Sequence, residues 1–171
     1  METNTNSPEK VYSYSAKFSI CKGKMGGFQA SPIPPTWNDG KTSEGKPTRK
    51  VTKEGAILIE LAPFLKEEDG NKYYDWANKK VSFGLGLPDI ASIIGSGGAE
   101  TKLVHVNEKT SETKTLIITP GKGDYEGTFM MSLNVSREGG EKTSSRIAFS
   151  SGEWAVFLVL LRSQVPALLG W

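Results

Sequence analysis

The chain has 171 residues, enough for one domain with a substantial core and too few for two independent ones. Its 21 basic and 19 acidic side chains give a net charge of +2, too small for strong non-specific attraction to duplex DNA. A single cysteine, Cys21, excludes both an intramolecular disulfide and a thiolate zinc cluster. We therefore expect one domain whose stability depends on no disulfide.

The charge is distributed unevenly along the chain. Residues 1–53 contain nine basic and four acidic side chains, a balance of +5, whereas residues 54–171 contain twelve and fifteen, a balance of -3. We therefore expect an anionic partner to bind the first third of the chain.

The N-terminal segment is polar, contains Pro8 and shows no apolar period, so residues 1–9 are expected to be a disordered tail and residues 10–171 the single domain. The same segment has neither an apolar signal core nor an Arg-rich presequence. We expect either that no targeting segment is needed or that one is missing from this chain.

The first predicted strand spans residues 10–22, in which aromatic and apolar side chains alternate with polar ones. The tripeptide Lys22-Gly23-Lys24 follows and places two ammonium groups beside a glycine, whose backbone N–H can also approach an anion. Residues 28–35 predict an edge strand that ends at its prolines. Residues 38–47 are rich in Gly, Lys, Ser and Thr and predict a mobile loop or a hairpin tip.

The remainder of the chain shows the same order of strands and helix twice. The strands are predicted at residues 48–62, 73–87, 101–107, 113–119, 125–135 and 142–150. A short helix is expected to begin near Pro88 and to end at Gly95, and a long helix is expected to begin near Ser151, with Glu153 in its first turn.

The C-terminal helix is apolar on every side over residues 154–161. A helix without a polar face is buried all round, and in a small domain only one face can meet the core, so we expect a homo-oligomer. Pro166 is expected to kink or end this helix. The apolar run is far shorter than the roughly 20 residues that span a bilayer, so no membrane association is expected. The predicted oligomer interface consists of Trp154, Phe157, Leu158 and Leu161.

No catalytic, metal or cofactor site is predicted. His105 is the only histidine and has no cysteine nearby, so we interpret it as structural. The acidic run Glu67-Glu68-Asp69 precedes Gly70 and is typical of a solvated turn. The glycine pairs at 95–98 and 121–123 lack the spacing of a P-loop or of a dinucleotide fingerprint.

Cations and aromatic side chains are interleaved in the first half of the chain, which is the combination that single-stranded nucleic acid binding needs. An alternative is that the aromatic residues are core and the lysines a solvated face. The predicted phosphate contacts are Lys22, Lys24, Arg49, Lys50 and Lys80, and the predicted stacking residues are Phe28, Trp37, Tyr74 and Trp76.

Five segments of the chain resemble the Whirly family of plant single-stranded DNA-binding proteins. They are KVYSYSAKFSICKGK at residues 10–24, SPIPPTWN at 31–38, YDW at 74–76, SLNV at 132–135 and LGW at 169–171. Their order and spacing are intact, and the resemblance covers nearly the whole chain from residue 10 to residue 171.

The resemblance implies an α+β fold of two antiparallel four-stranded β-sheets packed crosswise, with a short helix and with a long C-terminal helix at the centre of a homotetramer. It also implies binding of single-stranded DNA over the sheets and between subunits, with little sequence preference. Family members act in the plastid, the mitochondrion or the nucleus, in organelle genome maintenance and DNA repair, transcription regulation and the defence response. A plastid or mitochondrial location is therefore expected, with the nucleus as the alternative.

The chain departs from the family pattern after Lys24. The family usually has two small residues and a leucine there, whereas residues 25–28 are Met-Gly-Gly-Phe. In the family this loop is tied to the assembly of tetramers into larger particles.

Three other functions stay open. One is an RNA-binding or RNA-annealing factor on the same scaffold, which a contact to the 2′-hydroxyl would distinguish. A second is an oligomeric interaction scaffold that binds acidic proteins. A third is a duplex promoter-binding factor. The sequence predicts no helix with a basic exposed face that could enter a major groove, which argues against this function.

Overall fold

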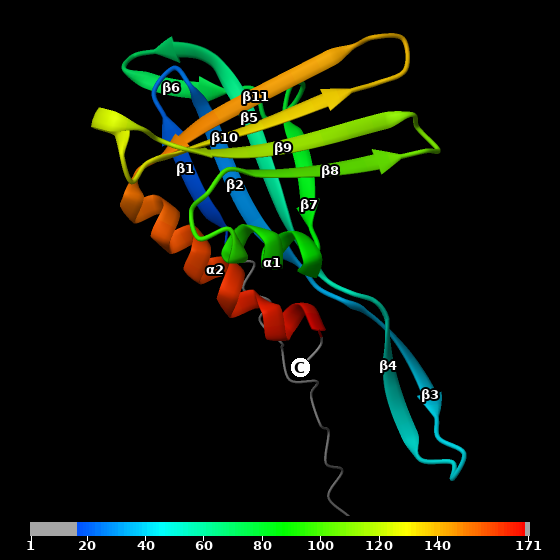
Figure 1. Cartoon of the computed structure of the whole chain (residues 1–171). Helices are drawn as coiled ribbons and strands as arrows, with labels where there is room; N and C mark the ends of the chain where they lie inside the picture. The colour runs from blue at the N-terminus through cyan, green and yellow to red at the C-terminus, as the bar shows by residue number, and fades with distance from the viewer. Residues whose placement is uncertain (1–16, 170–171) are drawn as a thin grey trace, which may run out of the picture.

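The longest strand, β5 (Ala56–Glu68), forms the centre of the first sheet in a computed structural model that describes residues 17–169 (Figure 1). It pairs with β2 (Gly26–Ile33), which in turn pairs with β1 (Phe18–Lys22). It also pairs with β7 (Val81–Leu85) along residues 57–61 and with β6 (Asn71–Tyr74) along residues 64–68. All of these pairings are antiparallel.

The second sheet has the order β11-β10-β9-β8, and each neighbouring pair is antiparallel. Its strands cross those of the first sheet (Figure 1). The two antiparallel sheets are therefore arranged as the family resemblance implied, but the first sheet has five strands instead of four, because β6 adds to β5 beside β7. The bounds are β8 (Thr101–Asn107), β9 (Glu112–Pro120), β10 (Phe129–Ser136) and β11 (Lys142–Phe149), with a short 3-10 helix η1 (Gly123–Tyr125) between β9 and β10.

A two-stranded hairpin leaves the first sheet between β2 and β5 and projects away from both sheets (Figure 1). It consists of β3 (Thr36–Lys41) and β4 (Pro47–Lys53). The Thr42 N–H donates to the Lys46 carbonyl and the Gly45 N–H donates to the Thr42 carbonyl, so the hairpin tip predicted within residues 38–47 is confirmed.

Helix α1 (Leu87–Gly95) begins at Leu87, one residue before the predicted start near Pro88, and Ile90 and Ile93 face the core. Asp89 accepts a hydrogen bond from the Gly86 N–H at the start of this helix, at 2.9 Å, and its Oδ2 lies 3.0 Å from His105 Nε2 on β8. The His105 ring also stacks on Phe83, with ring centroids 4.1 Å apart. The structural interpretation of His105 is thus supported by both contacts.

Helix α2 (Ser151–Leu169) lies across the two sheets and continues through Pro166, so Pro166 does not end it. Ser150, not Ser151, caps its start: the Ser150 N–H and Oγ each donate to Glu153 Oε2 at 2.7 Å. By length and composition α2 could cross a membrane. The sequence-based expectation that the apolar segment is far too short to span a bilayer is therefore corrected. A core helix meets the same criteria, and four side chains of α2 are buried in this fold.

An aromatic cluster between the sheets and α2 forms the centre of the core. The Phe28 ring contacts those of Phe149 and Phe157 edge to face, at centroid distances of 5.0 and 5.6 Å. Phe129 stacks on Trp154 at 4.4 Å. Edge-to-face and stacked pairs are the favoured geometries of aromatic rings, so this cluster joins strands of both sheets to the helix.

Three strand predictions need correction. Strand β2 is not an edge strand, because it pairs with β1 on one side and β5 on the other. Its Pro32 is accommodated because the described pairing with β1 stops at Ala30. The strand predicted over residues 48–62 is divided between β4 of the hairpin and β5 of the first sheet. The strand predicted over residues 73–87 is divided between β6 and β7. Residues 10–16 of the first predicted strand, and the tail over residues 1–9, lie outside the described residues.

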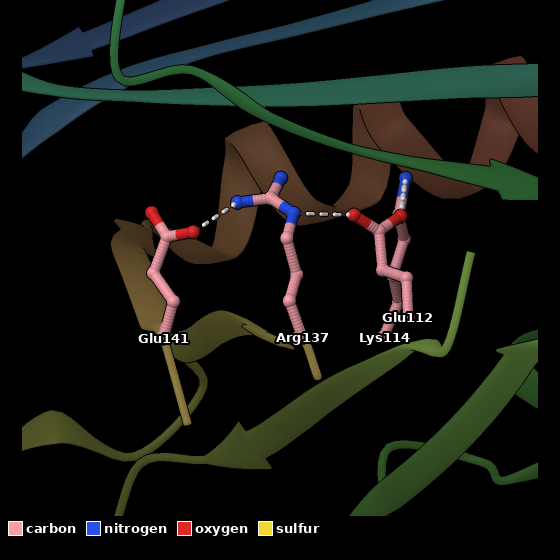
Figure 2. Close-up of polar contacts among 4 residues, drawn as sticks. All are labelled: Glu112, Lys114, Arg137 and Glu141. Carbon is pink, nitrogen blue, oxygen red and sulfur yellow. Dashed lines mark hydrogen bonds and ion pairs between the residues drawn. The ribbon is translucent and has the colours of Figure 1, made fainter. Parts of the chain in front are cut away.

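An ion-pair network joins the start of β9 to the turn between β10 and β11, as Figure 2 shows. Arg137 Nε lies 2.9 Å from one Glu112 oxygen, and Lys114 Nζ lies 3.3 Å from the other. Arg137 also contacts Glu141 at 3.5 Å. Burial alone would raise the pKa of Glu112, but the hydrogen bonds and charges of Lys114 and Arg137 outweigh it and hold the pKa below its usual value.

We expect Glu112→Gln to lower the free energy of unfolding by about 1 kcal/mol at neutral pH. Because the folded-state pKa of Glu112 is lowered, its contribution is present above the unfolded pKa and is lost as pH falls through the folded pKa. Urea unfolding at pH 7 and at about pH 3 should therefore show a larger difference from the wild type at pH 7 than at the lower pH. An equal loss at both pH values would contradict the assignment, and Glu108→Gln on the neighbouring exposed turn serves as the control.

Candidate nucleic-acid interface

The turn between β1 and β2 is fixed on two sides. Lys22 Nζ lies 2.6 Å from Glu153 Oε2 at the start of α2, and the Tyr74 hydroxyl donates to the Gly23 carbonyl at 3.0 Å. Burial raises the pKa of Glu153, but hydrogen bonds from Lys22 and Ser150 outweigh this effect and leave the pKa lowered, which favours the ion pair at neutral pH. Lys24 is exposed and forms no ion pair among residues 17–169.

Tyr74 and Trp76 lie next to this turn on the outer face of the first sheet. A Cβ atom at Gly27 would come within 2.7 Å of the Trp76 ring and 3.4 Å of Tyr74, so glycine is needed for these rings to cover β2. Burial, followed by the neighbouring Cys21 thiol, raises the pKa of Tyr74, which keeps its hydroxyl protonated as a donor. Both rings are half-buried, so part of each surface can meet a base.

Three of the predicted phosphate contacts already have carboxylate partners, and one of the three is Arg49, which pairs with Asp39 on the hairpin. Lys22 pairs with Glu153, and Lys80 Nζ lies 2.6 Å from Glu60 Oε1 on β5. A cation that is paired with a carboxylate attracts a phosphate less strongly than a free one. Lys24 is therefore the cation at this turn that is best placed for an anion.

Phe28 is not a stacking residue. Its side chain is 0% exposed and lies among Phe18, Phe149 and Phe157 in the core. The stacking role predicted for Phe28 is corrected, because no nucleobase can reach a ring that the protein covers completely.

The hairpin holds a separate group of predicted residues. Arg49 lies over the Trp37 ring, 5.4 Å from its centroid, and its Nε donates to Asp39 Oδ1 at 2.9 Å. In the strand register Lys50 lies opposite Asn38. Because Lys50 follows Arg49 directly and side chains alternate along a strand, Lys50 lies on the opposite face of the hairpin from Arg49. The structure thus does not bring Trp37, Arg49 and Lys50 together with the β1–β2 turn.

The outer face of the second sheet presents cations that the sequence analysis did not select. In the strand register, Lys102, Ile117, Ser132 and Arg146 form one outward row, which follows from the pairing of their neighbours. Two rows further along, Lys142 lies opposite Ser136 and close to Thr113. Lys102, Lys142 and Arg146 are exposed, and none forms an ion pair within the part of the chain that the structure describes.

Two hollows open on this outer face. One, of about 340 Å³, is lined mainly by hydroxyl and amide groups of Thr115, Asn134, Ser136 and Ser144, with Lys142 at its side. The other, of about 410 Å³, lies at the opposite end, where the β1–β2 turn meets the loop after β9. Hydroxyl and amide groups with nearby cations can bind phosphate oxygens and base edges without any covalent step.

The predicted oligomer interface on α2 also needs correction. Trp154, Phe157 and Leu161 are 6%, 0% and 0% exposed, so the protein itself covers these side chains and they have no surface to offer a second copy. Leu158 is partly buried against the same core. The large apolar side chains of α2 that are exposed are instead Val156 and Val159, at 52% and 62%.

Crossed sheets with an outward face of cations, hydroxyls and half-buried rings define a binding protein for an extended anionic ligand. The family model described as Whirly transcription factor matches residues 20–160, and the chain belongs to the Whirly family. Whirly proteins bind single-stranded DNA and are not enzymes, so the predicted family and non-enzymatic class are confirmed. The comparison with curated proteins gives no match.

Solved structures of plant proteins have the same fold. WHY3 from Arabidopsis thaliana is 26% identical, with a TM-score of 0.76 over 96% of this chain and 92% of that one. The plant transcriptional regulator PBF-2 is 25% identical, with a TM-score of 0.78 over 95% and 93%. WHY1 from Arabidopsis thaliana is 24% identical, with a TM-score of 0.75 over 91% and 86%, and supports the fold alone.

Proposed function

We propose that this protein binds single-stranded DNA with little sequence preference, as a homotetramer, along a surface that joins the β1–β2 turn to the outer face of the second sheet. The observation that supports this proposal most is a set of cations on this surface that have no carboxylate partner among residues 17–169: Lys24, Lys102, Lys142 and Arg146.

Phosphates would bind these cations and release counterions, while bases would stack on exposed aromatic faces. Both contacts are independent of base sequence, because every nucleotide has a phosphate and a planar base. Trp37, Arg49 and Lys50 on the hairpin would contact a longer strand at a second place. A duplex is disfavoured, because the exposed residues of α2 include Val156 and Val159 instead of a basic face for a major groove.

We propose that a second copy of the chain covers the exposed apolar face of α2 and the groove between α1 and α2. Val156 and Val159 are exposed, and an apolar groove of about 520 Å³ lies between α1 and α2, lined by residues that include Ile90, Ile94 and Val165. An exposed apolar surface of this kind is typical of an interface between subunits. Tetramers could assemble further on long DNA, and residues 25–28 would then set how this chain does so.

The cellular role follows from the family and not from the geometry. We propose organelle genome maintenance, including DNA repair, in the plastid or the mitochondrion. Transcription regulation linked to the defence response is the nuclear alternative, and the similarity to a plant transcriptional regulator supports it.

Binding of matched single-stranded and double-stranded oligonucleotides at two salt concentrations tests the proposal. We expect a clear preference for the single strand, an affinity that falls as salt rises, and a particle of four chains by light scattering. An RNA oligonucleotide of the same sequence is expected to bind less tightly.

Three results would reject parts of this assignment. Equal binding of duplex and single strand would favour a promoter-binding factor. Tighter binding of RNA would make RNA the ligand. Absence of binding to all three, together with an intact tetramer, would favour a scaffold for acidic proteins.

A further inference from the structure

The apolar hollow of about 410 Å³ is built from both sheets. The loop after β9 forms one wall with Tyr125, Lys122 and Pro120, and outward residues of β10 and β11, Met130 and Ala148, form the floor. Met25 of the β1–β2 turn also lines the hollow. Its volume lies within the range of roughly 300–1,000 Å³ that small-molecule sites occupy.

Tyr125 is the most exposed large apolar side chain in the described part of the structure, at 71%. Its loop is nonetheless well fixed: the Thr128 N–H and hydroxyl both donate to the Tyr125 carbonyl, at 3.0 and 2.6 Å, and the Gly121 N–H donates to the Thr128 carbonyl at 2.8 Å. A Cβ atom at Gly121 would lie 2.1 Å from the Tyr125 carbonyl oxygen, so glycine is needed for this crossing. An exposed ring on a fixed loop is already arranged for a ligand, which lowers the entropy cost of binding.

Cations lie in or next to the lining of the hollow. Lys122 lines it directly, and Lys24 precedes the lining residue Met25 in the sequence. The loop also contains Asp124 and Glu126, but neither lines the hollow. Arg146 lies two residues before the lining residue Ala148 on β11 and therefore on the same face of the sheet. An apolar cavity with cations nearby suits a planar apolar group that is attached to phosphates.

We propose that this hollow binds one unstacked nucleobase of the single strand, with the base against Tyr125 and Met25 and the flanking phosphates at Lys24 and Lys122. The assignment rests on the proposed function and adds to it the place where a base leaves the stack. Methionine sulfur also contacts aromatic rings favourably, so Met25 supplies a second surface for the base.

The test compares an oligo-dT with an abasic oligomer of the same length, which has the phosphates but no bases. Fluorescence anisotropy with the full chain should show that Tyr125→Ala binds oligo-dT roughly five-fold or more weakly than the wild type does. Its affinity for the abasic oligomer and the slope of log K against log salt should stay unchanged, because no phosphate contact is lost. Met25→Ala should show the same pattern with a smaller loss.

Tyr73→Ala is the matched control, because Tyr73 is 45% exposed but lies on β6 outside the hollow. It should bind oligo-dT as the wild type does. Equal losses for Tyr125→Ala on both oligomers, or no loss on either, would overturn the base assignment.

Two further outcomes separate this inference from the function on which it rests. If the wild type binds neither oligomer, the proposed function and the base assignment both fail. If the wild type binds oligo-dT and the Met25 and Tyr125 variants change only the mass of the particle, the hollow is a contact between copies and the base assignment alone fails.

Discussion

Phe28→Ala is expected to lower the free energy of unfolding by about 3–5 kcal/mol, as measured by urea denaturation. The side chain is completely buried and packs edge to face on two other phenylalanines, one from the second sheet and one from α2. Its removal would leave a cavity where the sheets and the helix meet, and the fixed strands cannot close it.

Met25→Ala, three residues earlier, is the control for this expectation. Met25 is 39% exposed, so the same measurement should change by no more than about 1 kcal/mol. A Phe28 variant that kept its stability but bound single-stranded DNA weakly would show that the ring stacks on a base, as the sequence analysis predicted, and that its burial is wrong.

We expect a triple variant in which glutamine replaces Lys102, Lys142 and Arg146 to bind single-stranded DNA more weakly than the wild type. The loss of affinity should be on the order of 100-fold larger at about 0.1 M salt than at about 1 M salt. Each phosphate contact adds about 0.7 to the slope of log K against log salt, so three contacts account for about 2. Fluorescence anisotropy over a salt series measures both the affinity and the slope.

The matched control removes three cations from the hairpin instead: Lys41, Lys50 and Lys53 are exposed and have no carboxylate partner within residues 17–169. The total charge of the two triple variants is the same, so a general loss of attraction would affect them equally. A larger loss for the hairpin variant would move the main binding surface from the second sheet to the hairpin.

Alternation of apolar and polar residues predicted most strands, because each strand packs one face on a shared core, whereas both helices were predicted from residues at their ends such as Pro88, Gly95 and Ser151. The same alternation placed Phe28 on the inner side of β2 with Ala30, whereas Gln29 and Ser31 are on the outer side. The stacking role assigned to Phe28 came from its position beside the cationic turn, which is a weaker indication than its place in the strand. The face of Phe28 could therefore have been predicted.

The ion pairs could not be predicted in the same way. Glu60 and Lys80 are 20 residues apart, and Lys22 and Glu153 come from opposite ends of the chain. Their meeting depends on the register of β5 and on the placement of α2 against the β1–β2 turn. No local pattern contains this information.

The cations of the second sheet were missed because charge was summed along the chain. Residues 54–171 have an excess of acidic groups, but many of these lie in turns, as Glu108 and Glu138 do, or are neutralised, as Glu112 is. Summing the charge by strand face would have identified Lys102, Lys142 and Arg146. Charge per face is thus a better guide to a binding surface than charge per segment.

The aromatic cluster also determines how a strand of DNA and this protein adapt to each other. Phe28, Phe149 and Phe157 interlock the two sheets and α2, so the two parts of the proposed surface cannot hinge apart. The DNA must therefore supply the flexibility, by rotating a base out of its own stack into a cavity that is already open. The association rate constant should then be lower for a strongly stacked purine tract than for a weakly stacked, flexible pyrimidine tract, even where the final complexes are equally stable.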